Sequence, residues 1–440
     1  MAEANPDRQQ TLLPALALGL TTLAFIVAKT GRDALFFQGS GGLLQLPLIY
    51  INIGGASLPL ALLFVKTMKI WGARPARIGL FLLAAAVMAA AAPFLQPGGN
   101  LLLLALFMFI PAIFGLLFAS LWLLASDLFE KTEKSAAARA FSRIGAATLA
   151  GGMLGGLLAK GLAPVLDAKW LIFLGAVVLL GAAALALRIH HRFPTNFIPN
   201  NDKKRPGGFL TPLTNKYALT LLFISMSGAL AGLLIDFQFY AAAAGAKANA
   251  GFFANFYILL NFSSLLLQLF ATPKIQDRVG LRGGLMVLPL ALIGGATFAT
   301  AAATALSRSV LRVTEGGLRS SVHRSIWEQA FIPLESSDRS AVKIVIDGVA
   351  ARVAEAAGAV VLLVWLKQTA PGGALPMPLN TTWITWLTLA TVIAWLAITQ
   401  KLRVQARQER AASPAAALDI DCERFPDQCP CTTELGKGVA

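Results

Sequence analysis

Charged residues, histidines and cysteines are scarce in this chain of 440 residues. Asp, Glu, Lys and Arg together make up 13% of it, and it has only three histidines and three cysteines. The sequence contains no HExxH, GxSxG, P-loop or paired-histidine metal motif, so we expect neither an enzyme nor a metal site, and no cofactor. The cysteines, which all follow the last apolar segment without a histidine nearby, are interpreted as reduced thiols in a flexible tail: Cys422, Cys429 and Cys431.

Apolar residues are abundant instead, at 56% of the chain. A helix needs about 20 apolar residues to cross the hydrocarbon core of a membrane. About twelve windows qualify: 12–36, 46–65, 78–95, 101–124, 144–166, 170–187, 217–240, 252–270, 285–306, 308–334, 342–366 and 383–399. The sequence therefore predicts an all-α polytopic membrane protein with about twelve transmembrane helices.

Basic residues lie mainly on alternate connections between these windows, on the side that also holds the N-terminus. Because cytoplasmic loops carry the excess of Lys and Arg, we expect a multi-pass protein of the bacterial inner membrane with both termini cytoplasmic. The same pattern accounts for the formal charge of +15, from 37 basic and 22 acidic residues, without nucleic acid. The expected partners are the lipid bilayer and a small anionic or zwitterionic solute. The protein is expected to be a monomer.

A polar segment at 189–216, rich in Pro, Gly, Asn and basic residues, separates two groups of six windows. It predicts a cytoplasmic linker between an N-terminal half at 1–188 and a C-terminal half at 217–400. Beyond them, 401–440 is expected to be a flexible cytoplasmic tail.

The two halves share a loop after their second window. In each half this loop opens with Lys-Ile, at Lys69 and at Lys274, and closes with Gly-Leu, at Leu80 and at Leu285. Two six-helix halves with a matching loop favour a major-facilitator-like fold.

The tenth window carries a stripe of ionisable residues at steps of four, three, four and four: Arg308, Arg312, Glu315, Arg319 and His323. This spacing places them on one face of a helix. Charge inside a membrane is costly, so such residues usually face a water-filled cavity and mark a solute path. The alternative, an amphipathic helix on the membrane surface, would put the segments that follow on inconsistent sides.

Other windows contain further ionisable residues. In the first, Lys29 and Arg32 share a face near the outer end, where they line a cavity or snorkel to the headgroups, and Asp33 neutralises one of them. In the seventh, Asp236 must be paired, protonated or solvated. An ion pair with the first helix is the structural interpretation of Asp236, and a gate, a proton site or a ligand contact is the functional one. The eleventh window adds Asp347 and Arg352, a candidate interhelical pair, and Glu355.

Two parts of the chain carry recognisable patterns. The first window ends with Lys29-Thr-Gly-Arg32-Asp33-Ala-Leu35. Later segments read Glu328-Gln-Ala-Phe-Ile-Pro-Leu334, Ile346-Asp347-Gly-Val349 and Glu355-Ala-Ala-Gly358. These stretches resemble the RDTKDTL, KEMAYIPL, IDVV and GK..G patterns of the ATP/ADP translocase family. The resemblance implies a nucleotide exchanger related to the major facilitator fold. It also implies that Arg32 stands for a nucleotide-contacting lysine and Asp236 for an acid of the seventh helix.

The chain departs from that family at two points. Glu355 stands where the family has the lysine of GK..G, and 101–124 has no ionisable residue where the family has an acid. Reversing a charge beside phosphate costs on the order of several kcal/mol at close range. We therefore expect a changed substrate rather than strict ATP/ADP exchange.

These patterns predict a secondary transporter that works by alternating access on a nucleotide-like or other phosphorylated or zwitterionic anion. The expected substrate-binding residues are Lys29, Arg32, Asp236, Arg312, Arg319, His323 and Glu355, and the expected gating or ion-pair residues are Asp33, Glu315, Asp347 and Arg352. Two alternatives stay open at this point: a proton-coupled exporter of amphiphilic compounds, and a membrane sensor on the same fold without transport.

Overall fold

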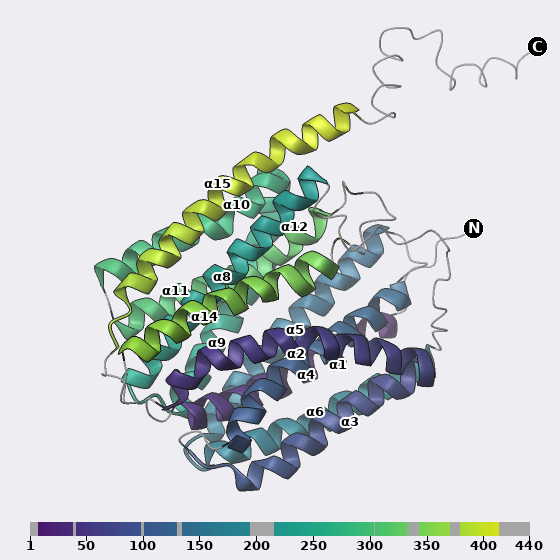
Figure 1. The fold of residues 1–440 in the computed structure, drawn as a ribbon. Helices are drawn as coiled ribbons and strands as arrows, with labels where there is room; N and C mark the ends of the chain where they lie inside the picture. Colours follow the sequence, from purple (N-terminus) through teal and green to yellow (C-terminus); the bar gives the residue numbers. More distant parts are fainter. Residues whose placement is uncertain are drawn as a thin grey trace, which may run out of the picture.

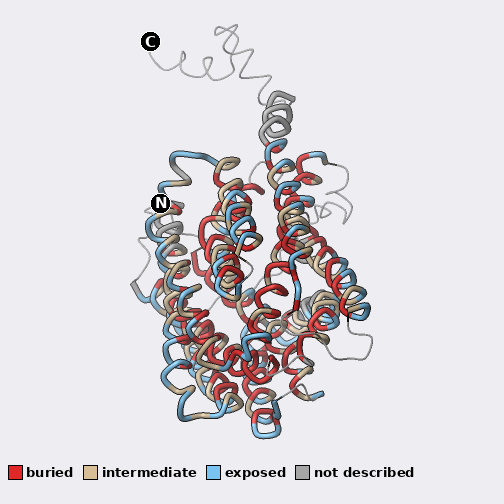
Figure 2. The backbone as a smooth tube through the Cα atoms, turned by 90° about the vertical axis from the view of Figure 1, so that its left-hand side faces the viewer, coloured by how far each residue is buried: buried red, intermediate tan, exposed pale blue. Residues whose placement is uncertain are grey.

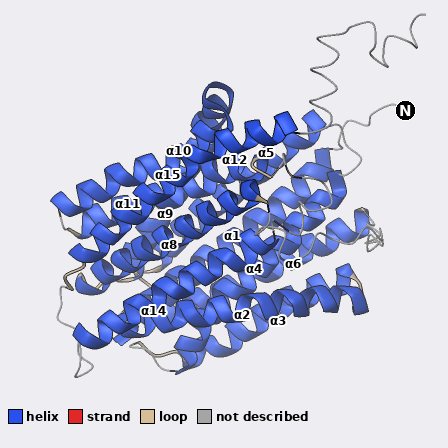
Figure 3. Ribbon diagram, turned by 45° about the horizontal axis from the view of Figure 1, so that its top comes forward, coloured by secondary structure: helices blue, strands red, loops and turns tan. Residues whose placement is uncertain are grey.

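The computed structural model is a bundle of helices, and no strand occurs among the residues that it describes (Figure 3). The described residues are 8–37, 41–97, 101–129, 134–193, 215–302, 304–331, 334, 342, 344–369 and 379–412.

The first six predicted windows form helices that lie together on one side of the bundle (Figure 1). They are α1 (Arg8–Phe36), α2 (Gly41–Trp71), α3 (Ala73–Ala91, followed by a 3-10 turn, Ala92–Phe94), α4 (Leu101–Phe129), α5 (Lys134–Leu162) and α6 (Ala168–Arg192). Helix α1 packs against α4, α5 and α6, and α3 packs against α6.

The second six windows form the other side of the bundle (Figure 1). They are α8 (Lys216–Gly245), α9 (Ala250–Leu266, extended by a π-helical turn, Leu267–Ala271), α10 (Thr272–Ala301), α11 (Ala305–Leu318), a π-helical turn (Arg319–His323), α12 (Arg324–Gln329), a π-helical segment (Ile344–Ala350), α14 (Ala351–Thr369) and α15 (Thr382–Ala412). Helix α15 packs against α8 and α10, and α11 packs against α8, α9 and α10.

Helical structure therefore occurs in each predicted window. Nine of the helices, judged on their described residues, are long and apolar enough to cross a membrane. The predicted linker and tail overlap the ends of described helices, because α6 continues to Arg192, α8 begins at Lys216 and α15 continues to Ala412, so 401–412 is helical. Residues 194–214 and those from 413 onward, including the three cysteines, lie outside the described residues, so the rest of the linker and of the tail remains a prediction.

Buried residues line the inside of the bundle, and exposed ones form its outer faces (Figure 2). Many of the exposed side chains are large and apolar, such as Leu62, Leu83 and Leu101, whose exposed fractions are 61%, 53% and 82%. A water-soluble surface rarely carries so much apolar area, whereas a lipid-facing surface requires it.

The two sides of the bundle meet mainly along two helix pairs, α5 with α9 and α2 with α14, and α9 also contacts α1. Helix α5 approaches its neighbours closely through glycines. A Cβ at Gly151 would lie 2.1 Å from the carbonyl oxygen of Gly19 in α1, and a Cβ at Gly152 would lie 2.2 Å from Oδ1 of Asn261 in α9. Small residues permit such close contact between helix backbones, so α5 is held directly between α1 and α9.

Substitution of Gly151 tests this close contact. Gly151→Ala places a methyl group against the backbone of α1, which cannot give way as a flexible side chain does, and it is expected to cost about 1–3 kcal/mol. Gly145→Ala is the matched control, because a Cβ there meets nothing within 4 Å and the helix gains propensity. Thermal unfolding in detergent should show a lower melting temperature for Gly151→Ala only. Equal stability of the two variants would contradict the packing described here.

Candidate functional site

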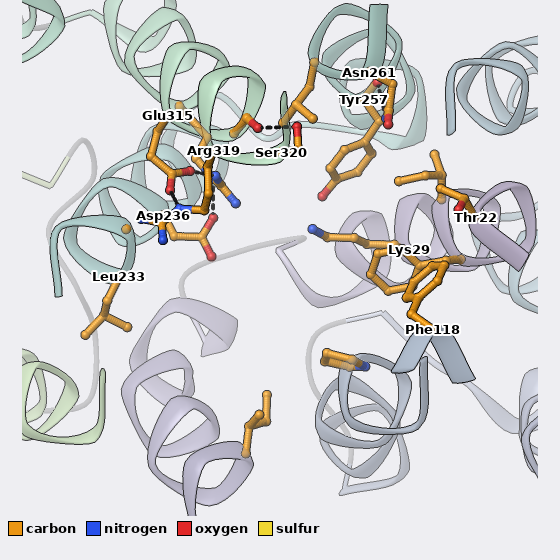
Figure 4. Close-up of a pocket in the computed structure, with 18 of the residues that line it drawn as sticks. Thr22, Lys29, Phe118, Leu233, Asp236, Tyr257, Asn261, Glu315, Arg319 and Ser320 are labelled. Carbon is orange, nitrogen blue, oxygen red and sulfur yellow. Dashed lines mark hydrogen bonds and ion pairs between the residues drawn. The ribbon is translucent and has the colours of Figure 1, made fainter. Parts of the chain in front are cut away.

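A cavity of about 670 Å³ lies between the two sides of the bundle. Its walls come from α1, α2, α4 and α5 on one side and from α8, α9, α11, α12 and α14 on the other. Figure 4 shows Lys29 pointing into this space from α1, opposite Asp236, Glu315 and Arg319.

Cations outnumber carboxylates in the lining. The basic side chains are six, Lys29, Arg32, Arg312, Arg319, Arg324 and Arg352, and the acidic ones are three, Asp236, Glu315 and Glu355. A concave site with an excess of one charge concentrates ions of the opposite charge. The lining therefore carries an excess of positive charge, although two of its cations, Arg32 and Arg324, pair with carboxylates outside it, Asp33 and Glu328.

Four of these charges form one chain of ion pairs on the C-terminal side. Asp236 accepts a hydrogen bond from Nε of Arg312, at 2.6 Å, and another from the hydroxyl of Tyr50 in α2, at 2.8 Å. Arg312 also donates to Glu315, which accepts a second bond from Arg319. The partner found for Asp236 thus lies in α11, and the ion pair considered between Asp236 and the first helix is not the pairing present.

Lys29 differs from the other cations of the cavity. Among the described residues it has no carboxylate at ion-pair distance, whereas Arg32, Arg312, Arg319, Arg324 and Arg352 each have one. Its Nζ lies 4.7 Å from the ring centre of Tyr257 and 5.7 Å from that of Phe25. Such cation–π contacts hold an ammonium group without neutralising it. Lys29 therefore offers a charge that an incoming anion can pair with.

Buried side chains bound the cavity toward the Phe36 end of α1, and we call this region its closed end; it contains the carboxylate of Asp33. Oδ1 of Asp33 accepts hydrogen bonds from Nε and Nη2 of Arg32, at 2.8 and 2.5 Å. Oδ2 of Asp33 accepts one from the hydroxyl of Tyr240 in α8, at 3.0 Å, and one from the hydroxyl of Tyr257 in α9. One carboxylate thus joins the N-terminal side of the bundle to two helices of the C-terminal side.

Aromatic rings complete this closed end. Phe37 stacks on Tyr240 at 4.3 Å between ring centres, and both rings contact Phe253. The guanidinium of Arg32 lies 3.8 Å from the ring centre of Phe107, which in turn contacts Phe37. All these side chains are buried, and burial strengthens the hydrogen bonds that Asp33 accepts.

Most of the predicted site residues line this cavity: Lys29, Arg32, Asp236, Arg312, Arg319 and Glu355 from the predicted binding set, and Glu315 and Arg352 from the predicted pairs. Arg352 donates to Glu355 of its own helix, at 2.7 Å. Asp347 lies in the π-helical segment Ile344–Ala350, but its side chain is outside the described set, so the proposed pair of Asp347 with Arg352 stays a prediction.

His323 and Arg308 do not line the cavity. For His323 the reason is an irregular helix: the sequence stripe assumed one regular helix, but the turn Arg319–His323 is π-helical. A π-helical turn contains more residues than an α-helical one, so it shifts the residues that follow around the helix axis. His323 instead stacks on Trp327, at 5.8 Å between ring centres, and meets Trp395 edge-on at 5.6 Å.

The sequence patterns missed the uncharged residues of the site. The chain has only four tyrosines, and three of them, Tyr50, Tyr240 and Tyr257, line the cavity. Apolar aromatic side chains also face it, among them Phe25 and Phe118. The positions of the tyrosines inside apolar windows were the available signal, because a tyrosine hydroxyl buried in a membrane-spanning helix needs a hydrogen-bond partner and so indicates a polar site.

Comparisons with known proteins give a fold but no relative at the sequence level. No protein-family model matches the sequence, and no curated protein matches it. Among solved structures, the POT family transporter PepTSo aligns over 90% of this chain and 99% of its own, with a TM-score of 0.66 and 12% identity. The nucleoside transporter NupG aligns over 88% of this chain and 98% of its own, with a TM-score of 0.60 and 12% identity.

Both neighbours have the major facilitator fold, so the predicted all-α, major-facilitator-like membrane architecture is confirmed. The similarity supports that fold and does not single out the ATP/ADP translocase family.

Proposed function

We propose that this protein is a secondary transporter that carries an anionic or zwitterionic solute by alternating access. The observation that carries this proposal is the excess of six cations over three carboxylates in a cavity between the two sides of a major facilitator fold. In transporters with such repeats, substrate sites lie near the middle of the membrane at the interface of the halves.

Lys29 is the first contact proposed for the anionic group, because its charge is not already paired with a carboxylate among the described residues. Arg312 and Arg319 are the second contacts. Guanidinium groups bind phosphate or carboxylate in a bidentate manner, so a substrate anion competes with Asp236 and Glu315 for them. Glu355 and any carboxylate released in this way then receive hydroxyl or cationic groups of the substrate.

The rest of the lining supports a substrate with a flat or apolar part. Phe25, Phe118 and Trp122 line the N-terminal side of the cavity. A cavity of about 670 Å³ lies within the usual range of small-molecule sites, about 300–1,000 Å³. A nucleotide-like solute combines phosphate with a planar ring and matches both features, and it is the class that the ATP/ADP translocase resemblance implies.

The proposed setting is a bacterial inner membrane, with both termini in the cytoplasm and one chain as the working unit. The Lys and Arg distribution supports this orientation. It puts the Phe36 end of α1 on the outer side, so the contacts of Asp33 with Tyr240 and Tyr257 close the cavity toward the outside. The halves that would move are 1–188 and 217–400, with the linker 189–216 between them.

Counterflow in proteoliposomes tests this function. Vesicles are loaded with unlabelled ATP, ADP or a pool of phosphorylated metabolites, and uptake of labelled ADP is followed. Uptake is expected only when a nucleotide is present inside. Uptake that is equal in empty vesicles would contradict exchange.

Two further outcomes separate the alternatives. A proton-coupled exporter of amphiphilic compounds predicts that Asp236→Asn abolishes coupling while Arg319→Gln is tolerated. A sensor without transport predicts binding without turnover. If no phosphorylated or zwitterionic anion is taken up by folded protein, the proposed function is wrong.

A further inference from the structure

The contacts of Tyr257 connect the cavity to its closed end. The hydroxyl of Tyr257 donates to Asp33, and the ring face of the same residue lies 4.7 Å from Nζ of Lys29. Tyr240 donates to Asp33 as well, but the aromatic rings that Lys29 contacts in the described part of the chain are those of Tyr257 and Phe25. Tyr257 is therefore the tyrosine that touches both the proposed anion-binding lysine and the carboxylate that holds the two sides of the bundle together.

The two contacts of Tyr257 influence each other. A cation over the ring withdraws electron density from the phenol and makes its O–H group a stronger hydrogen-bond donor. Asp33 is fully buried, so the strength of this bond is not diluted by water. Moving the ammonium of Lys29 away from the ring should therefore weaken the bond between Tyr257 and Asp33.

We propose that Tyr257 couples binding of an anion at Lys29 to opening of the cavity toward the outside. The hydrogen bonds that Asp33 accepts from Tyr240 and Tyr257 hold the outer side closed, and we call them the latch. This inference rests on the proposed function, in which Lys29 receives the anionic group of the solute. The arriving anion draws the ammonium off the ring, the bond from Tyr257 to Asp33 weakens, and α9 separates from α1. A solute thereby favours the conformational change that carries it, which is what an exchanger requires.

Cysteine labelling from outside measures opening of this latch. The background chain has its tail cysteines, Cys422, Cys429 and Cys431, replaced with serine, and carries Ile53→Cys in the cavity wall. Right-side-out membrane vesicles without added solute are treated with a membrane-impermeant maleimide. Tyr257→Phe is expected to raise the external labelling rate about tenfold, the effect of losing one hydrogen bond to a carboxylate. Lys29→Met is expected to raise it less, about threefold.

Double variants test whether Lys29 acts through Tyr257. Lys29→Met should add nothing further in the Tyr257→Phe background, because the bond that it weakens is already gone. It should still raise labelling in the Tyr240→Phe background, since the donor of Tyr257 is intact there. Tyr217→Phe is the matched control: it removes a buried tyrosine hydroxyl that donates to the carbonyl of Ala330 within the C-terminal side, at 2.8 Å, and labelling should not change.

Two results would overturn the inference. One is a labelling rate of Tyr257→Phe equal to that of Tyr217→Phe, which would show that the bond from Tyr257 to Asp33 does not hold the outer side closed. The other is an equal effect of Lys29→Met in the Tyr257→Phe and Tyr240→Phe backgrounds, which would show that Lys29 does not act through Tyr257. The assay contains no solute, so a failure of nucleotide counterflow would count against the proposed function and would leave these labelling results interpretable.

Discussion

Lys29→Gln is expected to reduce solute uptake about 10- to 100-fold, the largest loss of function among the cavity residues. The anion loses a charge-assisted hydrogen bond, which is worth about 1.5–3 kcal/mol. The arginines cannot replace it without cost, because Arg312 and Arg319 would first have to give up Glu315 or Asp236. Initial uptake rates across a range of solute concentrations in proteoliposomes measure the effect.

The controls for Lys29 separate charge from shape. Lys29→Arg keeps the charge and should retain a substantial part of the uptake. Arg324→Gln removes another cation of the lining, but its side chain is 64% exposed and paired with Glu328, so it should change uptake little. Equal losses in Lys29→Gln and Arg324→Gln would mean that the cavity attracts anions by its total charge and that Lys29 has no special role.

The fold follows from the sequence because membrane-spanning helices must satisfy their own backbone hydrogen bonds. Windows of sufficient length and hydropathy therefore located α1, α4 and α8 within a few residues. Helix ends were less predictable: α2 continues to Trp71, beyond the apolar window, through Lys66 and Lys69. Polar residues at the membrane surface end a hydrophobic window without ending a helix.

The charged part of the site was predictable for the same physical reason, while its pairing was not. A residue such as Asp236 or Arg312 inside an apolar window needs water or a partner, so it points to a cavity. Its partner depends on which helices pack together, and Arg312 lies 76 residues from Asp236. The π-helical turn that moves His323 away from the cavity leaves no mark in a periodicity that assumes 3.6 residues per turn.

Arg312→Gln is expected to cause the largest loss of stability. The guanidinium joins Asp236 and Glu315, whose side chains are 20% and 2% exposed. Removing one partner of a buried pair leaves an uncompensated charge and costs about 3–5 kcal/mol. Here both carboxylates lose Arg312 as a partner, although Asp236 keeps its bond from Tyr50 and Glu315 keeps its bond from Arg319. Thermal unfolding in detergent, followed by tryptophan fluorescence, should show a melting temperature several degrees lower.

Second substitutions tell an unpaired charge from a lost packing contact. Asp236→Asn in the Arg312→Gln background removes one of the unpaired charges and should recover part of the lost stability, whereas lost packing would not be restored by this change. Arg319→Gln serves as the comparison, because Glu315 keeps Arg312 as its partner and the loss should be smaller. If Arg312→Gln and Arg319→Gln unfold at the same temperature, Arg312 is not the central residue of this network, and the substrate contacts proposed for it lose their structural basis.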